Sequence, residues 1–297
     1  MPAVPRPVTA PDPARARAAQ LAGRAAATAL RRPGGDAVSD LVALEEPLEI
    51  RIAGETVGVL MRTPGDDHRL ALGYLFSEGI VSSASEFSAV YHCGRPGEEA
   101  YGSAIELAPA SGARIDWERI EGTRRASASS SACGVCGRRA VEDLVAGLVP
   151  PEPIAPVPAA LLAEKVEALR DHQPVFAATG GAHVAALWAQ DGSLVAAHED
   201  VGRHNAVDKV VGALLLARAE AAAGAPELRP ALLTVSSRAG FEIVQKAARA
   251  RVPIVATVSA PTSLAVELAR AAGLTLAGFV RPGRMNVYAG AERLIGL

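Results

Sequence analysis

The chain has 297 residues, of which 49% are apolar and 4% aromatic, and its formal net charge is −2. This length is sufficient for one large domain or two medium domains with real cores. The weak net charge excludes a basic surface field for nucleic acid, and the scarcity of aromatics argues against stacking platforms. No apolar run approaches the roughly 18–20 residues of a membrane span, so we expect neither a nucleic-acid nor a membrane partner.

The first residues differ in composition from the rest of the chain. Residues 1–35 contain six arginines, one acidic residue and several prolines. Such a segment lacks the apolar residues needed for a core, so we predict a disordered Ala/Arg/Pro tail over residues 1–37. The whole chain contains three cysteines, too few for a disulfide framework, which indicates a reducing compartment.

Residues 38–125 predict a small α+β domain. Extended segments are expected at residues 48–52, 57–61, 79–82 and 104–107, and the first two form a hairpin across Ala53-Gly54-Glu55. A helix is expected over His68–Glu78, after a capping segment that begins at Thr63. Its apolar spacing predicts a buried face made of Leu70, Leu72, Leu75 and Phe76.

Residues 126–297 predict a larger domain. It begins with a polar loop at Ser127–Ser131 and a helix that ends near Leu148, and a proline-rich joint covers residues 149–158. Helices are then expected at residues 160–171, 205–222, 241–250 and 264–272, and strands at 184–188, 193–197, 231–235, 253–258 and 274–280. This alternation predicts an α/β fold with a mainly parallel sheet and helices on both faces.

Ligands of such sheets bind beyond the carboxyl ends of the strands. The loops expected there carry hydroxyl groups and arginines, namely Ser236, Ser237, Ser259, Thr262, Ser263, Arg203, Arg238, Arg281 and Arg284. Helix starts combined with arginines suit phosphate or pyrophosphate groups. The alternative is that the serines only cap helices and the arginines are ordinary surface residues.

A second polar cluster lies at the predicted strand-to-helix junction. It comprises His198, Glu199, Asp200, Arg203, His204 and Asp208. His204 and Asp208 are spaced i, i+4, so they can share one helix face, where a buried pair would only fix the junction. Alternatively, His198 or His204 lies near a ligand or a sulfur atom and exchanges a proton with it.

Cys133 and Cys136 form a Cys-x-x-Cys pair just before the predicted helix. Free N–H groups at a helix start and the adjacent Arg138 and Arg139 stabilise a thiolate. Four roles fit such a pair: a zinc site, a dithiol oxidoreductase, a structural pair and a persulfide carrier. A structural zinc site usually needs a second pair of ligands. The adjacent His92 and Cys93 do not have the spacing of such a pair. The spacing does not choose between oxidoreductase and carrier.

Five blocks of the sequence resemble the FdhD/NarQ family of sulfur-carrier accessory proteins of formate dehydrogenase. They are Ser131-Ala-Cys-Gly-Val-Cys-Gly, His198-Glu-Asp-Val-Gly-Arg-His-Asn-Ala-Val-Asp-Lys, Ser236-Ser-Arg-Ala-Gly-Phe-Glu-Ile-Val-Gln-Lys, Ser259-Ala-Pro-Thr-Ser-Leu-Ala and Gly278-Phe-Val-Arg-Pro-Gly-Arg-Met-Asn-Val-Tyr. The blocks occur in the family's order, and the resemblance extends from about residue 38 to the C-terminus.

The resemblance implies a cytidine-deaminase-like three-layer core after a smaller domain. It implies a cytoplasmic, homodimeric sulfurtransferase that accepts persulfide sulfur from a cysteine desulfurase. The sulfur would pass to the bis-molybdopterin guanine dinucleotide molybdenum cofactor before the cofactor enters formate dehydrogenase. Carried over by position, Cys133 is the persulfide carrier and Cys136 its partner, and the cofactor-binding residues are Phe279, Val280, Arg281, Pro282, Gly283 and Arg284. The loop residues Ser236, Ser237, Arg238, Ser259, Arg203 and His198 complete the expected ligand set.

Two rival classes remain open. A non-catalytic chaperone would bind the cofactor or the dehydrogenase without carrying sulfur. A zinc deaminase of related fold requires Pro-Cys-x-x-Cys and a His-x-Glu or Cys-x-Glu segment. In this chain Ala132 precedes Cys133, and no such segment occurs ahead of the pair, so we expect no structural metal.

Overall fold

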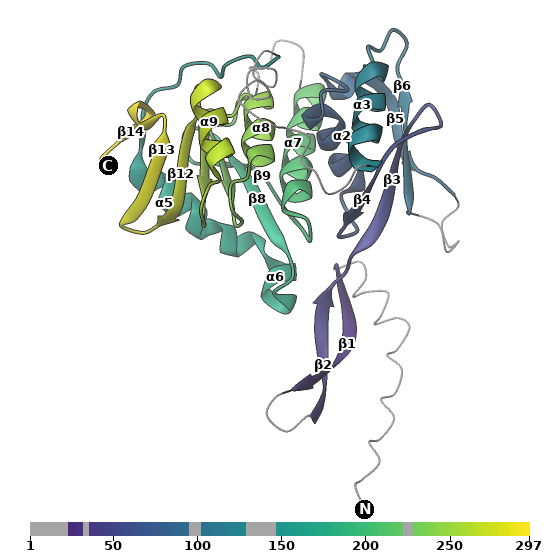
Figure 1. Cartoon of the computed structure of the whole chain (residues 1–297), viewed down its shortest axis with the longest axis horizontal. Helices are drawn as coiled ribbons and strands as arrows, with labels where there is room; N and C mark the ends of the chain where they lie inside the picture. The colour runs from purple at the N-terminus through teal and green to yellow at the C-terminus, as the bar shows by residue number, and fades with distance from the viewer. Residues whose placement is uncertain (1–22, 32–35, 95–101, 129–146, 222–227) are drawn as a thin grey trace, which may run out of the picture.

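The larger of two main sheets has six strands in the order β13-β12-β11-β10-β8-β9 (Figure 1). The computed structural model describes residues 23–31, 36–94, 102–128, 147–221 and 228–297. The strands are β8 (His183–Trp188), β9 (Leu194–Asp200), β10 (Leu232–Val235), β11 (Ile254–Thr257), β12 (Thr275–Arg281) and β13 (Arg284–Ala289). Each strand from β8 to β12 lies within two residues of its predicted position or extends it by a few residues.

The sheet is mixed, so the prediction of a mainly parallel sheet was wrong. Among the described strands, only β10–β11 and β11–β12 are parallel, whereas β8–β9, β8–β10 and β12–β13 are antiparallel. Two tight turns cause the difference: Asp191-Gly192 closes the β8–β9 hairpin, and Pro282-Gly283 reverses the chain into β13. A turn of this kind joins antiparallel strands, whereas a parallel pair needs a longer crossover.

Helices cover both faces of this sheet, which gives three layers. On one face lie α7 (Arg203–Glu220), α8 (Phe241–Arg249) and α9 (Ser263–Ala271). On the other lie α5 (Ala159–Glu167) and η2 (Ala168–His172), followed by α6 (Pro174–Thr179). The central strands β10 and β11 are buried along their whole length and mainly apolar, because alternate side chains enter the two cores. In β10, Leu233 packs on the first face and Leu232 on the second.

A second sheet, of four strands in the order β4-β3-β6-β5, is built from the N-terminal part of the chain. Its elements are β3 (Glu46–Ile52), β4 (Glu55–Arg62), α2 (Asp67–Ser77), η1 (Ala84–Glu86), β5 (Phe87–His92), β6 (Ala104–Pro109) and α3 (Trp117–Ala128). The predicted β3–β4 hairpin and the buried face of α2 are confirmed. The extended segment predicted at residues 79–82 is a turn that leads into η1, and Ser127 belongs to α3 instead of a loop.

The two sheets share one apolar core, because α2 and α7 pack directly against each other (Figure 1). Two glycines permit a close approach of the helix backbones. A Cβ atom at Gly73 would lie 1.8 Å from the carbonyl oxygen of Asp208, and one at Gly212 would lie 1.9 Å from that of Arg69. Any side chain at either position would therefore push the two helices apart.

Residues 24–31, which the sequence placed in the disordered tail, form a strand. This strand, β1 (Arg24–Arg31), pairs antiparallel with β2 (Asp36–Ala43) in a hairpin that projects from the body (Figure 1). The Ala-rich stretch carries little apolar alternation, so periodicity did not reveal it.

Two short strands, β7 (Val157–Pro158) and β14 (Leu294–Ile295), pair in parallel. Within the described ranges, no helix is long and apolar enough to cross a membrane.

Candidate functional site

The predicted ligand loops gather at one edge of the large sheet. The strands β10, β11 and β12 are parallel, and β9 runs in the same direction because both β9 and β10 are antiparallel to β8. Their carboxyl ends therefore meet at this edge, where α/β sheets bind ligands. The loops after these strands carry Arg203, Ser236 to Arg238, Ser259 and the β12–β13 turn.

A cavity of about 340 Å³ opens between this edge and the α5–η2–α6 segment. Four of the predicted ligand residues line it, namely Ser236, Val280, Arg281 and Pro282. We call this space the arginine-lined cavity, because Arg170 and Arg281 are its cationic groups. Its walls are otherwise mainly apolar, which is the usual composition of a small-molecule site with a few placed polar groups.

The β12–β13 turn separates the arginine-lined cavity from a second space. Arg281, Gly283 and Arg284 line this cleft of about 580 Å³, together with residues of α5, β13 and the C-terminus. Five of the six residues of the predicted terminal loop, all except Phe279, therefore line one or the other space. Arg281 lines both spaces and Arg284 lines the cleft, and both residues are exposed, so their guanidinium groups can contact a polyanion.

Phe279 enters the turn in a strained conformation. Its φ of 52° lies in the left-handed region, which a bulky side chain rarely adopts, and its ring is 38% exposed. The β12–β13 register shifts between Gly278 and Arg281, and the Phe279 N–H donates to the carbonyl of Ser259 at 3.1 Å. Backbone strain of this kind costs roughly 1–3 kcal/mol and is found preferentially at ligand sites.

The serines differ in role. The Ser236 Oγ accepts from the Val184 N–H at 3.1 Å, and Ser236 lines the cavity. The hydroxyl of the buried Ser237 instead donates to the Arg238 carbonyl at 3.0 Å. Neither caps a helix, since the N-cap residue of α8 is Gly240. The capping alternative holds for Thr262, whose Oγ1 accepts from the Ala265 N–H at the start of α9.

Three further predicted residues, Arg203, Arg238 and Ser259, also do not line the arginine-lined cavity. Arg203 and Arg238 are exposed beside it, at the start of α7 and after β10, and Ser259 follows β11 without lining it. Arg203 is nevertheless close enough to act on a cavity residue through its charge, because it opposes protonation of His183. Arg203 therefore belongs to the rim of the site.

Sequence reasoning missed His183, Glu167 and Arg170, which line the cavity. His183 is half-buried at the start of β8; burial, and then the charges of Arg203 and His204, lower the pKa of this imidazole. The neutral imidazole is therefore favoured near pH 7. His183 lies at the amino end of an antiparallel strand, and Glu167 and Arg170 lie on the helices of the opposite layer. The rule that ligands bind beyond the carboxyl ends of strands does not predict residues at these places.

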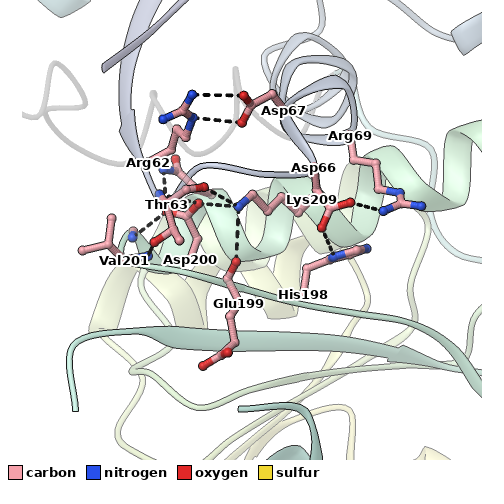
Figure 2. Close-up of polar contacts among 12 residues, drawn as sticks. Arg62, Thr63, Asp66, Asp67, Arg69, His198, Glu199, Asp200, Val201 and Lys209 are labelled. Atoms are coloured by element: carbon pink, nitrogen blue, oxygen red, sulfur yellow. Dashed lines mark hydrogen bonds and ion pairs between the residues drawn. The ribbon is translucent and has the colours of Figure 1, made fainter. Parts of the chain in front are cut away.

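The structure places His198 in a different environment. Its Nδ1 lies 3.1 Å from the Asp66 carboxylate, which Arg69 also contacts (Figure 2). His198 lines a third space of about 440 Å³ together with Thr63, Asp66, Asp171 and Glu199, and this space shares no lining residue with the arginine-lined cavity. The hydrogen bond from His198 keeps the pKa of Asp66 far below its ordinary value.

Behind this space lies a buried ionic network (Figure 2). The Lys209 ammonium group lies 2.8 Å from the Asp200 carboxylate and donates to the carbonyls of Thr63 and Glu199. Its three donors are thus occupied, and Asp200 also accepts from the Thr63 N–H. The network fixes the β4–α2 loop against β9, so we interpret it as structural.

The predicted His204–Asp208 pair does not form. The His204 Nδ1 lies 2.6 Å from the Glu242 carboxylate, and this hydrogen bond lowers the pKa of Glu242. Asp208 instead pairs with Lys246 at 2.7 Å and accepts from the Ser77 hydroxyl. His204 and Asp208 therefore each contact a side chain of a neighbouring helix instead of each other. Their partners are in α8 for both residues and also in α2 for Asp208.

Cys133, Cys136 and most of the helix predicted after them lie outside the described residues, and the last two residues of that prediction, Gly147 and Leu148, are not helical. The remaining cysteine, Cys93, is half-buried beyond β5. In the described part of the chain, no group of three or more His, Cys, Asp and Glu side chains could hold a metal ion.

The fold and site define a class: a three-layer α/β/α protein with an arginine-lined cavity at its strand ends and a Cys-x-x-Cys pair in its sequence. The family model described as FdhD/NarQ family matches residues 43–295. The chain belongs to the FdhD/NarQ family.

Its relatives agree with this assignment. The sulfur carrier protein FdhD of Anaeromyxobacter dehalogenans (strain 2CP-C) is 57% identical over 278 residues, covering 94% of this chain and 96% of the relative. The sulfur carrier protein FdhD of Streptomyces coelicolor is 45% identical, over 86% of this chain and 89% of the relative. A crystal structure from Desulfotalea psychrophila, described as a formate dehydrogenase accessory protein, has a TM-score of 0.67 at 27% identity, covering 92% of this chain and 98% of that chain.

Proposed function

We propose that this protein is a sulfur carrier that serves a formate dehydrogenase. The observation that carries the proposal is family membership over residues 43–295, with relatives named as sulfur carriers. The Cys-x-x-Cys pair supplies the thiols that such a role needs. The structural neighbour described as a formate dehydrogenase accessory protein supports the choice of client.

The sulfur enters by thiolate exchange. The Cys133 thiolate attacks the terminal sulfur of a persulfide on a cysteine desulfurase, which forms a persulfide on Cys133 and releases the donor's thiolate. The Cys136 thiolate then attacks the Cys133 sulfur, which forms a Cys133–Cys136 disulfide and expels hydrosulfide. A dithiol reductant returns the pair to its starting state. The order in which the two cysteines act is part of the proposal.

The sulfur's acceptor is a molybdenum cofactor with two guanine dinucleotide arms, and it is bound as cargo. The arginine-lined cavity supports this assignment, because Arg170 and Arg281 suit a pyrophosphate and the apolar walls suit a base. Arg284 extends the cationic surface across the β12–β13 turn. We also propose a cytoplasmic homodimer with a cytidine-deaminase-like large domain.

Mass spectrometry of the full chain tests the carrier role. After incubation with a cysteine desulfurase and cysteine, we expect a gain of about 32 Da, one sulfur atom, on Cys133. Cys133→Ala should abolish this gain, whereas the matched control Cys93→Ala should retain it, because Cys93 is not part of the Cys-x-x-Cys pair. Absence of the added mass on both Cys133 and Cys136 would contradict the proposal.

The same variants separate the rival functions. A chaperone that only binds the cofactor would still activate formate dehydrogenase as Cys133→Ala, whereas a carrier would not. The arginine-lined cavity would serve either protein, so activation is the deciding measurement. Stoichiometric zinc in the purified protein would contradict both and favour a hydrolase.

A further inference from the structure

Two pairs of charged side chains connect α7 with α8. His204 and Asp208 are spaced i, i+4 on α7, and Glu242 and Lys246 have the same spacing on α8, so the two helices meet at both levels. Asp208 and Lys246 form the buried pair, with the ammonium nitrogen 2.7 Å from a carboxylate oxygen. His204 and Glu242 form an outer pair one turn nearer the helix starts. The buried pair therefore fixes the position in which the outer pair meets.

The outer pair lies at the edge of the sheet where the ligand loops gather. Helix α7 follows β9 and helix α8 follows β10, and the carboxyl ends of both strands are at that edge. Between these strands lies β8, whose first residue, His183, lines the arginine-lined cavity. Burial, and then the charges of Arg203 and His204, lower the pKa of His183. His204 is thus close to a residue of the cavity wall.

The imidazole of His204 is held in one orientation. Its Nδ1–H donates to the Glu242 carboxylate at 2.6 Å, and this hydrogen bond is the main cause of the lowered pKa of Glu242. The neutral ring therefore carries its proton on Nδ1 and a lone pair on Nε2. Among the described residues Nε2 has no hydrogen-bond partner, and the side chain is 33% exposed. A carboxylate on one nitrogen and a free lone pair on the other are typical of a general base.

A purely structural role explains the outer pair less well. Both of its side chains are partly exposed, so water screens their attraction and the pair adds little stability. The sequence left open whether His198 or His204 exchanges a proton with a sulfur atom. His198 is only 16% exposed, and its Nδ1 faces Asp66 in a separate space. The geometry therefore favours His204 for proton exchange.

We propose that His204 is the general acid–base of sulfur transfer and that Glu242 is its positioning residue. The inference rests on the proposed sulfur-carrier function. Nε2 removes the proton of the accepting thiol, and the resulting thiolate attacks the outer sulfur of the donor persulfide. A new S–S bond forms while the donor's S–S bond breaks, and the imidazolium returns the proton to the departing thiolate. One thiol and one persulfide become one persulfide and one thiol, without net oxidation or reduction.

The charges around the imidazole determine how the reaction depends on pH. They belong to Arg203 and Asp208 on α7, Glu242 and Lys246 on α8, His183 on β8, and Glu78 on α2, which acts through Glu242. Glu242 is in direct contact with the ring, and a carboxylate stabilises an imidazolium, whereas a neutral amide does not. The rate of sulfur loading should therefore rise with pH as the imidazolium loses its proton, and removal of the carboxylate should move the inflection to lower pH.

Initial rates of sulfur loading test the proposal. The full-length protein is loaded by a cysteine desulfurase with cysteine, over a range of pH and carrier concentration, and mass spectrometry follows the added sulfur. His204→Gln retains an N–H donor for Glu242 but cannot take up the proton, so the saturating rate should fall about a hundredfold or more and lose its pH inflection. The half-saturating carrier concentration should stay the same, because docking is unaffected.

Two further variants complete the set. Glu242→Gln should lower the saturating rate less than His204→Gln does and should move the inflection to lower pH. His68→Gln replaces an exposed imidazole on α2, outside the site, and is the matched control that should load as wild type does.

The outcomes separate the inference from the function on which it rests. A His204→Gln protein with the wild-type rate and inflection would refute the role of His204 and leave the sulfur carrier in place. A wild-type protein that gains no sulfur would refute the carrier function, and the inference with it. An equal loss of rate at every pH, together with a lowered melting temperature, would assign His204 to the fold and also overturn the inference.

Discussion

Asp66 is the N-cap residue of α2, yet its carboxylate does not cap the helix. Its backbone is left-handed, with φ of 56°, and the side chain accepts from His198 instead. A position of this type favours Asn or Asp, which tolerate the left-handed region. The sequence indicated a cap in this segment but not its partner, because His198 lies more than 130 residues away in the chain.

The pair makes stability depend on pH. The folded state lowers the pKa of Asp66 below its ordinary value of 3.8, so this stabilisation is present above that pH and is lost as the pH falls through the folded value. We expect Asp66→Asn to lower the free energy of unfolding by about 1 kcal/mol at pH 7, a figure reduced because the side chain is 37% exposed. Urea denaturation should show the difference shrinking below about pH 4.

The matched control is Asp171→Asn, which removes an exposed carboxylate from the lining of the same space. It should unfold as wild type does at both pH values. A penalty for Asp66→Asn that stays constant from pH 7 to pH 3 would show that lost packing, not charge, is responsible.

At the scale of elements, periodicity located most helices and strands of the larger unit but not their directions. The pattern of β8 and β9 is the same whether the strands are parallel or antiparallel, so the mixed sheet could not be read from apolar spacing. The sequence predicts that the Pro282-Gly283 turn belongs to a ligand loop, and the structure shows that this turn also reverses the chain into β13.

The α2–α7 crossing yields a sharp prediction. Gly212→Ala should lower the free energy of unfolding by about 3 kcal/mol, because its Cβ would lie 1.9 Å from the Arg69 carbonyl oxygen and only backbone movement can relieve the clash. Gly122→Ala, in α3, is the matched control: nothing lies within 4 Å of its Cβ, so helix propensity should raise stability by up to about 1 kcal/mol. Thermal and urea unfolding measure both, and equal stabilities would contradict the close crossing.

At the scale of the whole molecule, the two sheets are joined by polar contacts as well as by a shared core. The buried Asp208–Lys246 pair connects α7 with α8, and the Ser77 hydroxyl brings in α2. The pattern along the chain predicts two domains, over residues 38–125 and 126–297, and that division stays a prediction. The joint core of the two sheets was not predictable, because apolar spacing within α2 and α7 shows that each is buried but not by what.

Breaking this connection should destabilise the whole molecule. Lys246→Met leaves the Asp208 carboxylate buried without its cation, so we expect a loss of about 3–5 kcal/mol in the free energy of unfolding. The double variant Asp208→Leu, Lys246→Met removes both charges and should recover most of that loss. Calorimetry measures all three proteins. A double variant that is less stable than Lys246→Met would contradict an ionic origin of the loss.

The segment from η2 to α6 contributes to two spaces at once. Arg170, Gln173 and Phe176 line the arginine-lined cavity, while Asp171, His172 and Pro174 line the space beside His198. The Glu199 carboxylate holds the segment by accepting from the Val175 and Phe176 N–H groups at 2.7 Å and 2.9 Å. Any occupant that shifts this shared wall from one side changes affinity on the other, and linkage makes that change equal in both directions. Movement of the η2–α6 segment would therefore couple ligand binding in the arginine-lined cavity to ligand binding in the space beside His198.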